Sequence, residues 1–395
     1  MRWKRLVLMV AGLFVQPGCA TIERQAFSLR EQQEASISAI PAARFWADAP
    51  DAARRMFPPI SADGRELTLL ALSGGADYGA FGAGVLNGWS RKGDRPQFSV
   101  VTGVSTGALI APFAFLGSDY DSALAQVYTN ISARDIYRMR FPLVIPGSVS
   151  AASTRPLERL IAARISDAMI DAVAQEHRRG RRLFVGTANL DAQRTVIWDM
   201  GAIAASRAAS RYALFRKVLL ASSSIPALFP PVVIDAAVGR RIIQELHVDG
   251  GTTAQILTLP IQTIVDNATN RPAGPVHLYL VVNNRLGGAF QFTKGKIGPV
   301  LKHAFALSLQ SSLYTLVSQT YLYAEDHKLN FRLAYISNEF PPSDVDMFDT
   351  AFMRRLYAFG LERGANGNAW SNRPPDQSDL LSVGSDTLPK EDKDH

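Results

Sequence analysis

Two short apolar runs, each followed by a glycine-rich turn and a stretch with helical spacing, restrict the fold of this chain most strongly. Residues 67–72 (LTLLAL) precede a glycine cluster, and residues 79–89 then have helical periodicity. Residues 98–102 (FSVVT) precede a second glycine turn, and residues 106–116 have the pattern of a helix. Unbroken apolar runs of this length are typical of strands buried on both faces. This β-α-β-α order predicts an α/β fold, in which helices cover a mainly parallel sheet.

The second turn contains a Gly-x-Ser-x-Gly pentad, from Gly103 to Gly107, within the stretch VTGVSTGALIAP. A serine on a tight strand-to-helix turn is pushed out of the sheet, often in strained backbone geometry. Flanking glycines keep other side chains away from its hydroxyl. The pattern predicts that Ser105 is a nucleophile, and the alternative is an ordinary tight turn between a strand and a helix.

The first turn, residues 73–79 (SGGADYG), offers backbone N–H groups beside that serine. We expect the amides of Gly74, Gly75 and Ala76 to point into a shared cavity and to form an oxyanion hole. A nucleotide phosphate loop is the alternative. It is disfavoured because the spacing Gly-x-Gly-x-x-Gly is not met and no Gly-Lys-Ser/Thr follows.

A general base is the remaining requirement of a serine nucleophile. None of the six histidines lies in a recognisable motif, whereas Asp249 stands at a predicted strand end before Gly250 and Gly251. A carboxylate serves as general base when it contacts the hydroxyl directly. Asp-Gly also forms ordinary turns, but together with the other two motifs we interpret Asp249 as the base. His247 shares a strand face with Asp249, and a packed histidine is its favoured interpretation.

In this order, the glycine-rich loop, the Gly-x-Ser-x-Gly pentad and Asp-Gly-Gly resemble the patatin-like phospholipases. The stretch ASSSIPALFPPV, residues 221–232, is also similar to that family. The resemblance covers residues 66–285 and extends more weakly to about residue 360. It departs from the family at Ala76 and Tyr78, where a third glycine and a basic residue are usual.

The resemblance implies a function and a fold. It implies a three-layer α/β/α sandwich and a Ser–Asp dyad without histidine, with Ser105 as nucleophile and Asp249 as base. It also implies hydrolysis of phospholipids or other acyl-ester lipids through a covalent acyl-serine, with no metal ion and no cofactor in the chemistry. Two alternatives stay open. One is a catalytically weak or inactive surface lipoprotein that binds lipid or a partner. The other is a Ser-His-Asp α/β-hydrolase esterase, disfavoured because only about 30 residues separate the glycine-rich loop from Ser105.

The N-terminus has the layout of a targeting segment. Three basic residues precede an apolar core at residues 6–15, and small residues with Cys19 follow. This order predicts a signal peptide over residues 1–18, with an ordinary buried N-terminal helix as the alternative. Cys19, the only cysteine, stands where bacterial lipoproteins are lipidated, although Gln16 departs from that pattern. We expect an exported lipoprotein anchored at the outer membrane or facing the periplasm, with plain secretion as the alternative.

The net charge and the composition bear on the expected partners and on the division of the chain into segments. The signal peptide holds three of the basic residues, so the net charge of +7 falls to +4 after its removal. That weak excess gives no reason to expect a nucleic-acid partner. Residues 19–64 are expected to form a tether and an irregular approach, and residues 65–364 the acyl-hydrolase domain. The polar residues 365–395 are expected to be disordered.

Overall fold

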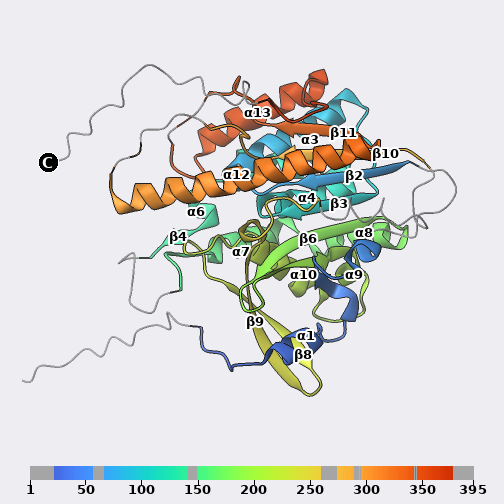
Figure 1. The fold of residues 1–395 in the computed structure, drawn as a ribbon, viewed down its shortest axis with the longest axis vertical. Coiled ribbons are helices and arrows are strands. Elements are labelled where there is room, and N and C mark those ends of the chain that lie inside the picture. Colours follow the sequence, from blue (N-terminus) through green and yellow to red (C-terminus); the bar gives the residue numbers. More distant parts are fainter. Residues whose placement is uncertain are drawn as a thin grey trace, which may run out of the picture.

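The computed structural model describes residues 22–56, 66–140, 149–258, 274–288, 293, 295–341, 343 and 345–376. The expected signal peptide and Cys19 lie outside these residues. Within them, the chain forms a nine-stranded sheet and a separate two-stranded sheet. Figure 1 shows β10 and β11 near α13 at one end of the molecule and the hairpin of β8 and β9 at the other.

Five neighbouring strands of the large sheet are parallel. Their order is β6 (Arg182–Asn189), β3 (Val100–Val104), β2 (Leu67–Leu72), β10 (Val276–Val282) and β11 (Asn330–Tyr335). The other four pair antiparallel and are β7 (Arg194–Asp199), β1 (Arg44–Trp46), β8 (Val232–Val238) and β9 (Arg241–Asp249). The small sheet pairs β4 (Arg138–Met139) with β5 (Ala152–Ser153). The mainly parallel sheet predicted from the sequence is therefore confirmed.

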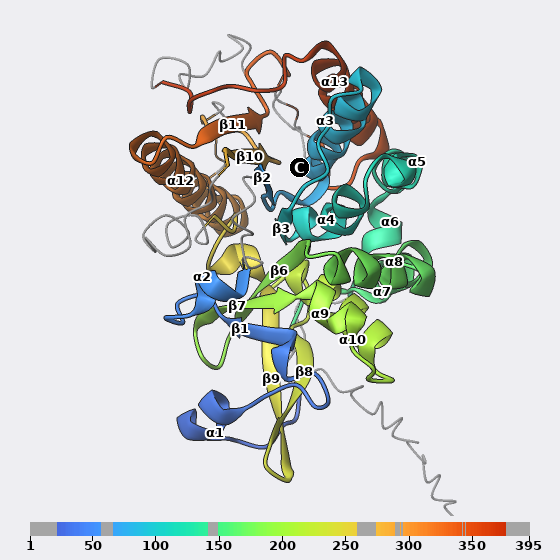
Figure 2. The ribbon, with the colours of Figure 1, turned by 90° about the vertical axis from the view of Figure 1, so that its right-hand side faces the viewer.

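Helices cover both faces of the sheet, as Figure 2 shows. One face carries α3 (Gly79–Lys92), α4 (Thr106–Leu116), α5 (Asp121–Thr129), α8 (Asp167–Arg178), α10 (Arg211–Ser222) and α13 (Thr350–Asn366). The other face carries α12 (Ile297–Asp326). Leu70 and Leu72 of β2 pack into the core on the first side, and Leu69 and Ala71 into the core on the second. This alternation explains why the strand is apolar throughout, and it produces three layers.

Shorter helices complete the chain. They are α1 (Leu29–Glu34), α2 (Ala52–Met56), α6 (Ala133–Ile136), α7 (Arg155–Arg164) and α9 (Met200–Ala205). Single 3₁₀ turns are formed by η1 (Pro41–Ala43), η2 (Ala76–Tyr78), η3 (Ser118–Tyr120) and η4 (Gly250–Thr252). None of the helices in the described parts of the chain is long and apolar enough to cross a membrane.

The pairing along β6 determines which residues meet at the end of the sheet. β3 pairs with the first part of β6, ending with Val104 opposite Gly186. β9 pairs antiparallel with the rest of that strand, and Asp249 is opposite Thr187. The residue after Val104 and the last residue of β9 therefore lie next to each other, although 144 positions separate them in the chain.

The segment expected as a tether contains a strand of the sheet. β1 pairs antiparallel with β7, and Ala43 and Phe45 are buried beside it. The expectation of a tether over residues 19–64 is therefore wrong for the described part of this segment. Strand β1 has only three residues, too few for a periodic pattern in the sequence, and it forms because it pairs with β7.

The C-terminal expectation also needs correction. α13 continues to Asn366, and the backbone of Ser371 exchanges two hydrogen bonds of 2.8 Å with Leu333 of β11. The ring of Trp370 lies 4.7 Å from that of Trp89, measured between ring centroids. Residues 365–376 are thus ordered on the domain. The packing of Trp370 and the pairing of Ser371 with β11 stabilise this segment despite its polar composition. The remainder of the predicted disordered tail, residues 377–395, lies outside the described residues.

Candidate active site

Ser105 lies on the sharp turn between β3 and α4. Its backbone has φ 55° and ψ −123°, a conformation that residues with a Cβ rarely adopt. The two glycines of the pentad allow the turn to be this tight. A Cβ on Gly103 would lie 2.4 Å from the carbonyl oxygen of Gly107, and a Cβ on Gly107 would lie 2.3 Å from that of Leu72. The pentad is therefore required by close backbone packing as well as by the position of the serine.

The hydroxyl of Ser105 donates a hydrogen bond to Asp249. The distance from Ser105 Oγ to Asp249 Oδ2 is 2.5 Å, and both residues are buried, with exposures of 7% and 6%. The other carboxyl oxygen, Oδ1, accepts the N–H of Gly251 at 2.8 Å. Burial raises the pKa of Asp249 to about 6, and the hydrogen bonds from Ser105 and Gly251 partly oppose that shift. One oxygen is thus held by the backbone while the other faces the serine.

His247 belongs to a different set of contacts. Its ring is buried, with Nδ1 2.9 Å from the hydroxyl of Thr187 and Nε2 3.0 Å from the carboxylate of Glu245. Among the residues that the structure describes, no histidine hydrogen-bonds to Ser105 or Asp249. The packed strand histidine was the favoured interpretation, and the structure agrees with it.

The serine run at the end of α10 supports both members of the pair, which the sequence analysis did not foresee. The hydroxyl of Ser222 accepts the N–H of Ser105 at 3.0 Å and donates to the carbonyl of Gly186 at 2.7 Å. The carbonyl of Ser224 accepts the N–H of Asp249 at 2.9 Å. The stretch ASSSIP had been noted only for its resemblance to a family, and no pattern within it indicates these contacts.

The glycine-rich loop lies beside Ser105, but its three amides are not equivalent. The N–H of Gly74 donates to the carbonyl of Gln255 at 3.0 Å, so it is used within the fold. The N–H groups of Gly75 and Ala76 form no hydrogen bond with the described part of the chain. Both residues have positive φ, 154° and 51°. The expected oxyanion hole of three amides is therefore reduced to two candidates in this structure.

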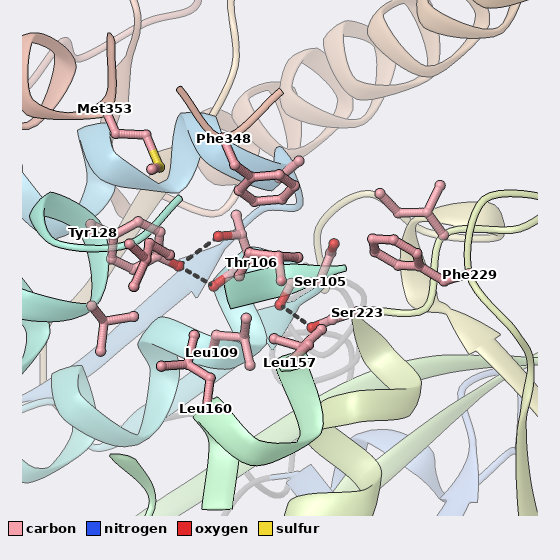
Figure 3. A pocket seen from close by; sticks show the side chains of 15 residues that line it. Ser105, Thr106, Leu109, Tyr128, Leu157, Leu160, Ser223, Phe229, Phe348 and Met353 are labelled. Carbon is pink, nitrogen blue, oxygen red and sulfur yellow. Dashed lines mark hydrogen bonds between the residues drawn. The ribbon is translucent and has the colours of Figure 1, made fainter. Parts of the chain in front are cut away.

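An apolar pocket begins at Ser105 and Ala76 and extends between the helices (Figure 3). Its walls are formed mainly by aliphatic and aromatic side chains: Leu109, Val127, Ile131, Ile136, Leu157, Leu160, Ile225, Phe229, Phe348 and Met353. The hydroxyl of Tyr128 lies 2.6 Å from that of Thr106, so these two polar groups satisfy each other. Among the described residues that line this pocket, none has a charged side chain. The pocket suits a hydrocarbon chain attached to a group that reacts at Ser105.

Comparison with known proteins agrees with this geometry. Residues 70–262 match the family model described as patatin-like phospholipase. This part of the chain is therefore similar to a patatin-like phospholipase domain. The matched residues of this domain include the glycine-rich loop, the pentad, the serine run and Asp249. The family indicates hydrolysis of lipid esters as the class of activity.

No curated protein sequence matches the chain. Among solved structures, the crystal structure of VipD from Legionella pneumophila aligns with a TM-score of 0.38 and 11% identity. The alignment covers 77% of this chain and 67% of that chain.

Within the residues that the structure describes, no group of three or more His, Cys, Asp or Glu side chains is placed to hold a metal ion.

Proposed function

We propose that this protein is a lipid acyl hydrolase, a phospholipase A-like esterase that uses a Ser–Asp dyad. The observation that carries this proposal is the 2.5 Å hydrogen bond from Ser105 Oγ to Asp249, with Ser105 lining an apolar pocket. The patatin-like domain supports the same class of substrate. The substrate is a phospholipid or another acyl-ester lipid.

The reaction has two stages. Asp249 takes the proton of Ser105 while Oγ attacks the ester carbonyl, and the amides of Gly75 and Ala76 stabilise the oxyanion. The proton then passes from Asp249 to the departing alcohol, which leaves an acyl-serine. Water attacks this ester with Asp249 again as base. The proton then passes from Asp249 to Ser105 Oγ as the bond between Oγ and the acyl group breaks, and the fatty acid is released. A pKa of about 6 suits a group that must both accept and return a proton near neutral pH.

Substitution of the two dyad residues tests this mechanism. Ser105→Ala and Asp249→Asn are each expected to lower kcat/KM for lipid esters by about a thousandfold or more, and the double variant by little beyond either. The effects do not add because the two residues act as one unit. Ser312→Ala, an exposed serine on α12, is the matched control and should retain full activity.

Other outcomes favour the alternatives. Near-full activity of Asp249→Asn, combined with loss of activity on substitution of a histidine, would support a Ser-His-Asp hydrolase. If the wild-type protein hydrolyses none of a panel of lipid esters yet binds lipid vesicles, the non-catalytic surface lipoprotein is correct. The same panel identifies the preferred headgroup.

We also propose that the protein is exported and anchored to a bacterial membrane through Cys19. The proposal is supported by the order of charged, apolar and small residues before the only cysteine. Mass spectrometry of the mature protein should find a chain that begins at Cys19 and carries acyl groups. Cys19→Ala should abolish the acyl groups. Cleavage elsewhere, or an unmodified Cys19, would contradict the proposal.

A further inference from the structure

One wall residue of the acyl pocket has a backbone conformation that its neighbours must enforce. Phe348 lines the pocket and has φ 63°. A bulky side chain at positive φ is an outlier that persists only where the surrounding structure determines it. Figure 3 shows its ring above Thr106, between Tyr128 and Phe229. Phe348 thus lines the same pocket as Ser105.

Asp77 is one of the groups that enforce this conformation. Its carboxylate oxygen Oδ2 accepts the N–H of Phe348 at 3.0 Å, although 271 positions separate the two residues. Asp77 is only 5% exposed, and the described groups that act on its carboxyl group are backbone N–H groups and the negatively charged Asp349, with no cation among them. Burying a carboxylate without a cation is unfavourable unless its oxygens are hydrogen-bonded. The N–H of Phe348 is one of the backbone groups that hydrogen-bond to this buried carboxyl group, together with those of Asp77 and Tyr78, so the contact links Phe348 to the glycine-rich loop.

The next residue restrains Phe348 from the other side. The side chain of Asp349 caps α13 by accepting the N–H of Phe352 at 2.7 Å. The backbone of Phe348 is therefore held between the glycine-rich loop, through Asp77, and the start of α13. Because Asp77 directly follows Ala76, the wall of the pocket and the candidate oxyanion hole are connected.

The ring of Tyr137 contacts both aromatic rings that line the pocket, those of Phe229 and Phe348. The ring of Tyr137 lies 6.3 Å from that of Phe348 and 5.7 Å from that of Phe229, measured between centroids. Phe229 and Phe348 line the pocket from different segments of the chain. Removing the ring of Phe348 would open this side and enlarge the space beside Ser105.

The acyl chain, and not the leaving alcohol, is the part of the substrate that occupies this pocket. The leaving part of a phospholipid carries a charged headgroup, which an uncharged apolar pocket would not desolvate favourably. We propose that Phe348 limits the size of the acyl group that the enzyme accepts, and that Asp77 is the positioning residue that holds Phe348 in place. This inference rests on the proposed function.

A series of p-nitrophenyl esters with acyl chains of increasing length tests the proposal on the full chain. Phe348→Ala is expected to raise the ratio of kcat/KM for long chains to kcat/KM for short chains by about tenfold or more, since each methylene accommodated in an apolar pocket has an effect of that size. The ratio is independent of the folded fraction, because unfolded protein lowers both values equally. Phe348→Leu provides a milder variant if Phe348→Ala fails to fold.

The role of Asp77 is tested by three further variants. Asp77→Ala should shift the ratio in the same direction as Phe348→Ala, and the double variant should show no additional shift. Asp77→Asn retains an oxygen that accepts the N–H of Phe348, and should restore the wild-type ratio. Phe340→Ala is the matched control, because Phe340 is buried nearby but does not line the pocket.

The two proposals fail in different ways. A wild-type protein that hydrolyses none of the esters overturns the proposed function. An active wild type with an unchanged chain-length ratio in Phe348→Ala overturns the role of Phe348 alone. A shift in Phe348→Ala without one in Asp77→Ala overturns the role of Asp77.

Discussion

At the scale of single residues, the carboxyl group of Asp249 combines burial with a short hydrogen bond. Its pKa of about 6 means that the folded protein binds a proton on this group more tightly than the unfolded chain does. The ionised form is the one that accepts the proton of Ser105. When Asp249 is ionised, and so able to accept that proton, its buried charge lowers the free energy of unfolding.

Asp249→Asn should make this cost measurable. The buried charge of Asp249 does not lower the free energy of unfolding below about pH 4. Its effect grows between pH 4 and 6 and reaches its full size above pH 6, because burial raises the pKa of Asp249 in the folded state from 3.8 to about 6. The variant should raise the free energy of unfolding at pH 7.5 by about 2–3 kcal/mol and change it little at pH 4. Denaturant unfolding at both pH values measures the difference. Asp235→Asn, an exposed aspartate on β8, is the control, and equal destabilisation of Asp249→Asn at both pH values would contradict the argument.

At the scale of elements, α3 and α13 pack through glycines. A Cβ on Gly84 of α3 would lie 2.2 Å from the carbonyl oxygen of Tyr357, and one on Gly360 of α13 would lie 2.4 Å from that of Phe81. The two backbones therefore approach more closely than side chains allow. This contact positions α13, which contributes Met353 to the acyl pocket.

Gly84→Ala should destabilise the protein, against the usual effect of this substitution. In a helix interior, replacing glycine with alanine ordinarily stabilises by about 1 kcal/mol. Here the added methyl overlaps the backbone of α13, so a loss of about 1–3 kcal/mol is expected. Thermal unfolding measures it, with Arg91→Ala, an exposed position on α3, as control. An increase in stability would show that the two helices separate without cost.

At the scale of the whole molecule, a buried ion pair joins the N-terminal segment to the strand that ends in Asp249. The guanidinium of Arg44 in β1 contacts both carboxylate oxygens of Glu245 in β9, with 2.7 Å from Nη2 to Oε1. The side chain of Gln32 donates to the same carboxylate at 2.6 Å. His247 contacts it from the neighbouring position on β9. This cluster joins Gln32 and Arg44 of the N-terminal segment to β9, the strand that ends at Asp249.

Arg44→Ala should lower the free energy of unfolding by about 3–5 kcal/mol, because it leaves the buried carboxylate of Glu245 without its cation. The double variant Arg44→Met with Glu245→Met should recover part of that loss, since it removes both charges. Denaturant unfolding measures both variants. Arg30→Ala breaks an exposed pair with Glu34 and should change stability by no more than about 0.5 kcal/mol. An equally small effect of Arg44→Ala would exclude a stabilising role for the buried pair.

The parts predicted correctly from the sequence are those with local causes. The apolar run at Leu67–Leu72 and the helix at Thr106–Leu116 have the bounds expected from periodicity alone. The position of Ser105 on a turn follows from a strand, two glycines and a helix within about fifteen residues. These features depend on neighbouring residues, so a single sequence carries them.

The tertiary structure decided what depends on distant residues. Strand β1 forms because β7 has a free edge for it to pair with. Residues 365–376 are ordered because the ring of Trp370 packs against those of Trp89 and Tyr279. Asp249 reaches Ser105 because β6 pairs with β3 along one part and with β9 along the next. Three further hydrogen bonds also depend on distant residues. They join the Gly74 N–H to the Gln255 carbonyl, the Ser105 N–H to the Ser222 hydroxyl, and the Phe348 N–H to the Asp77 carboxylate. Each joins positions whose separation in the chain leaves no periodic signal, since only the packed sheet and helices bring them within hydrogen-bonding distance.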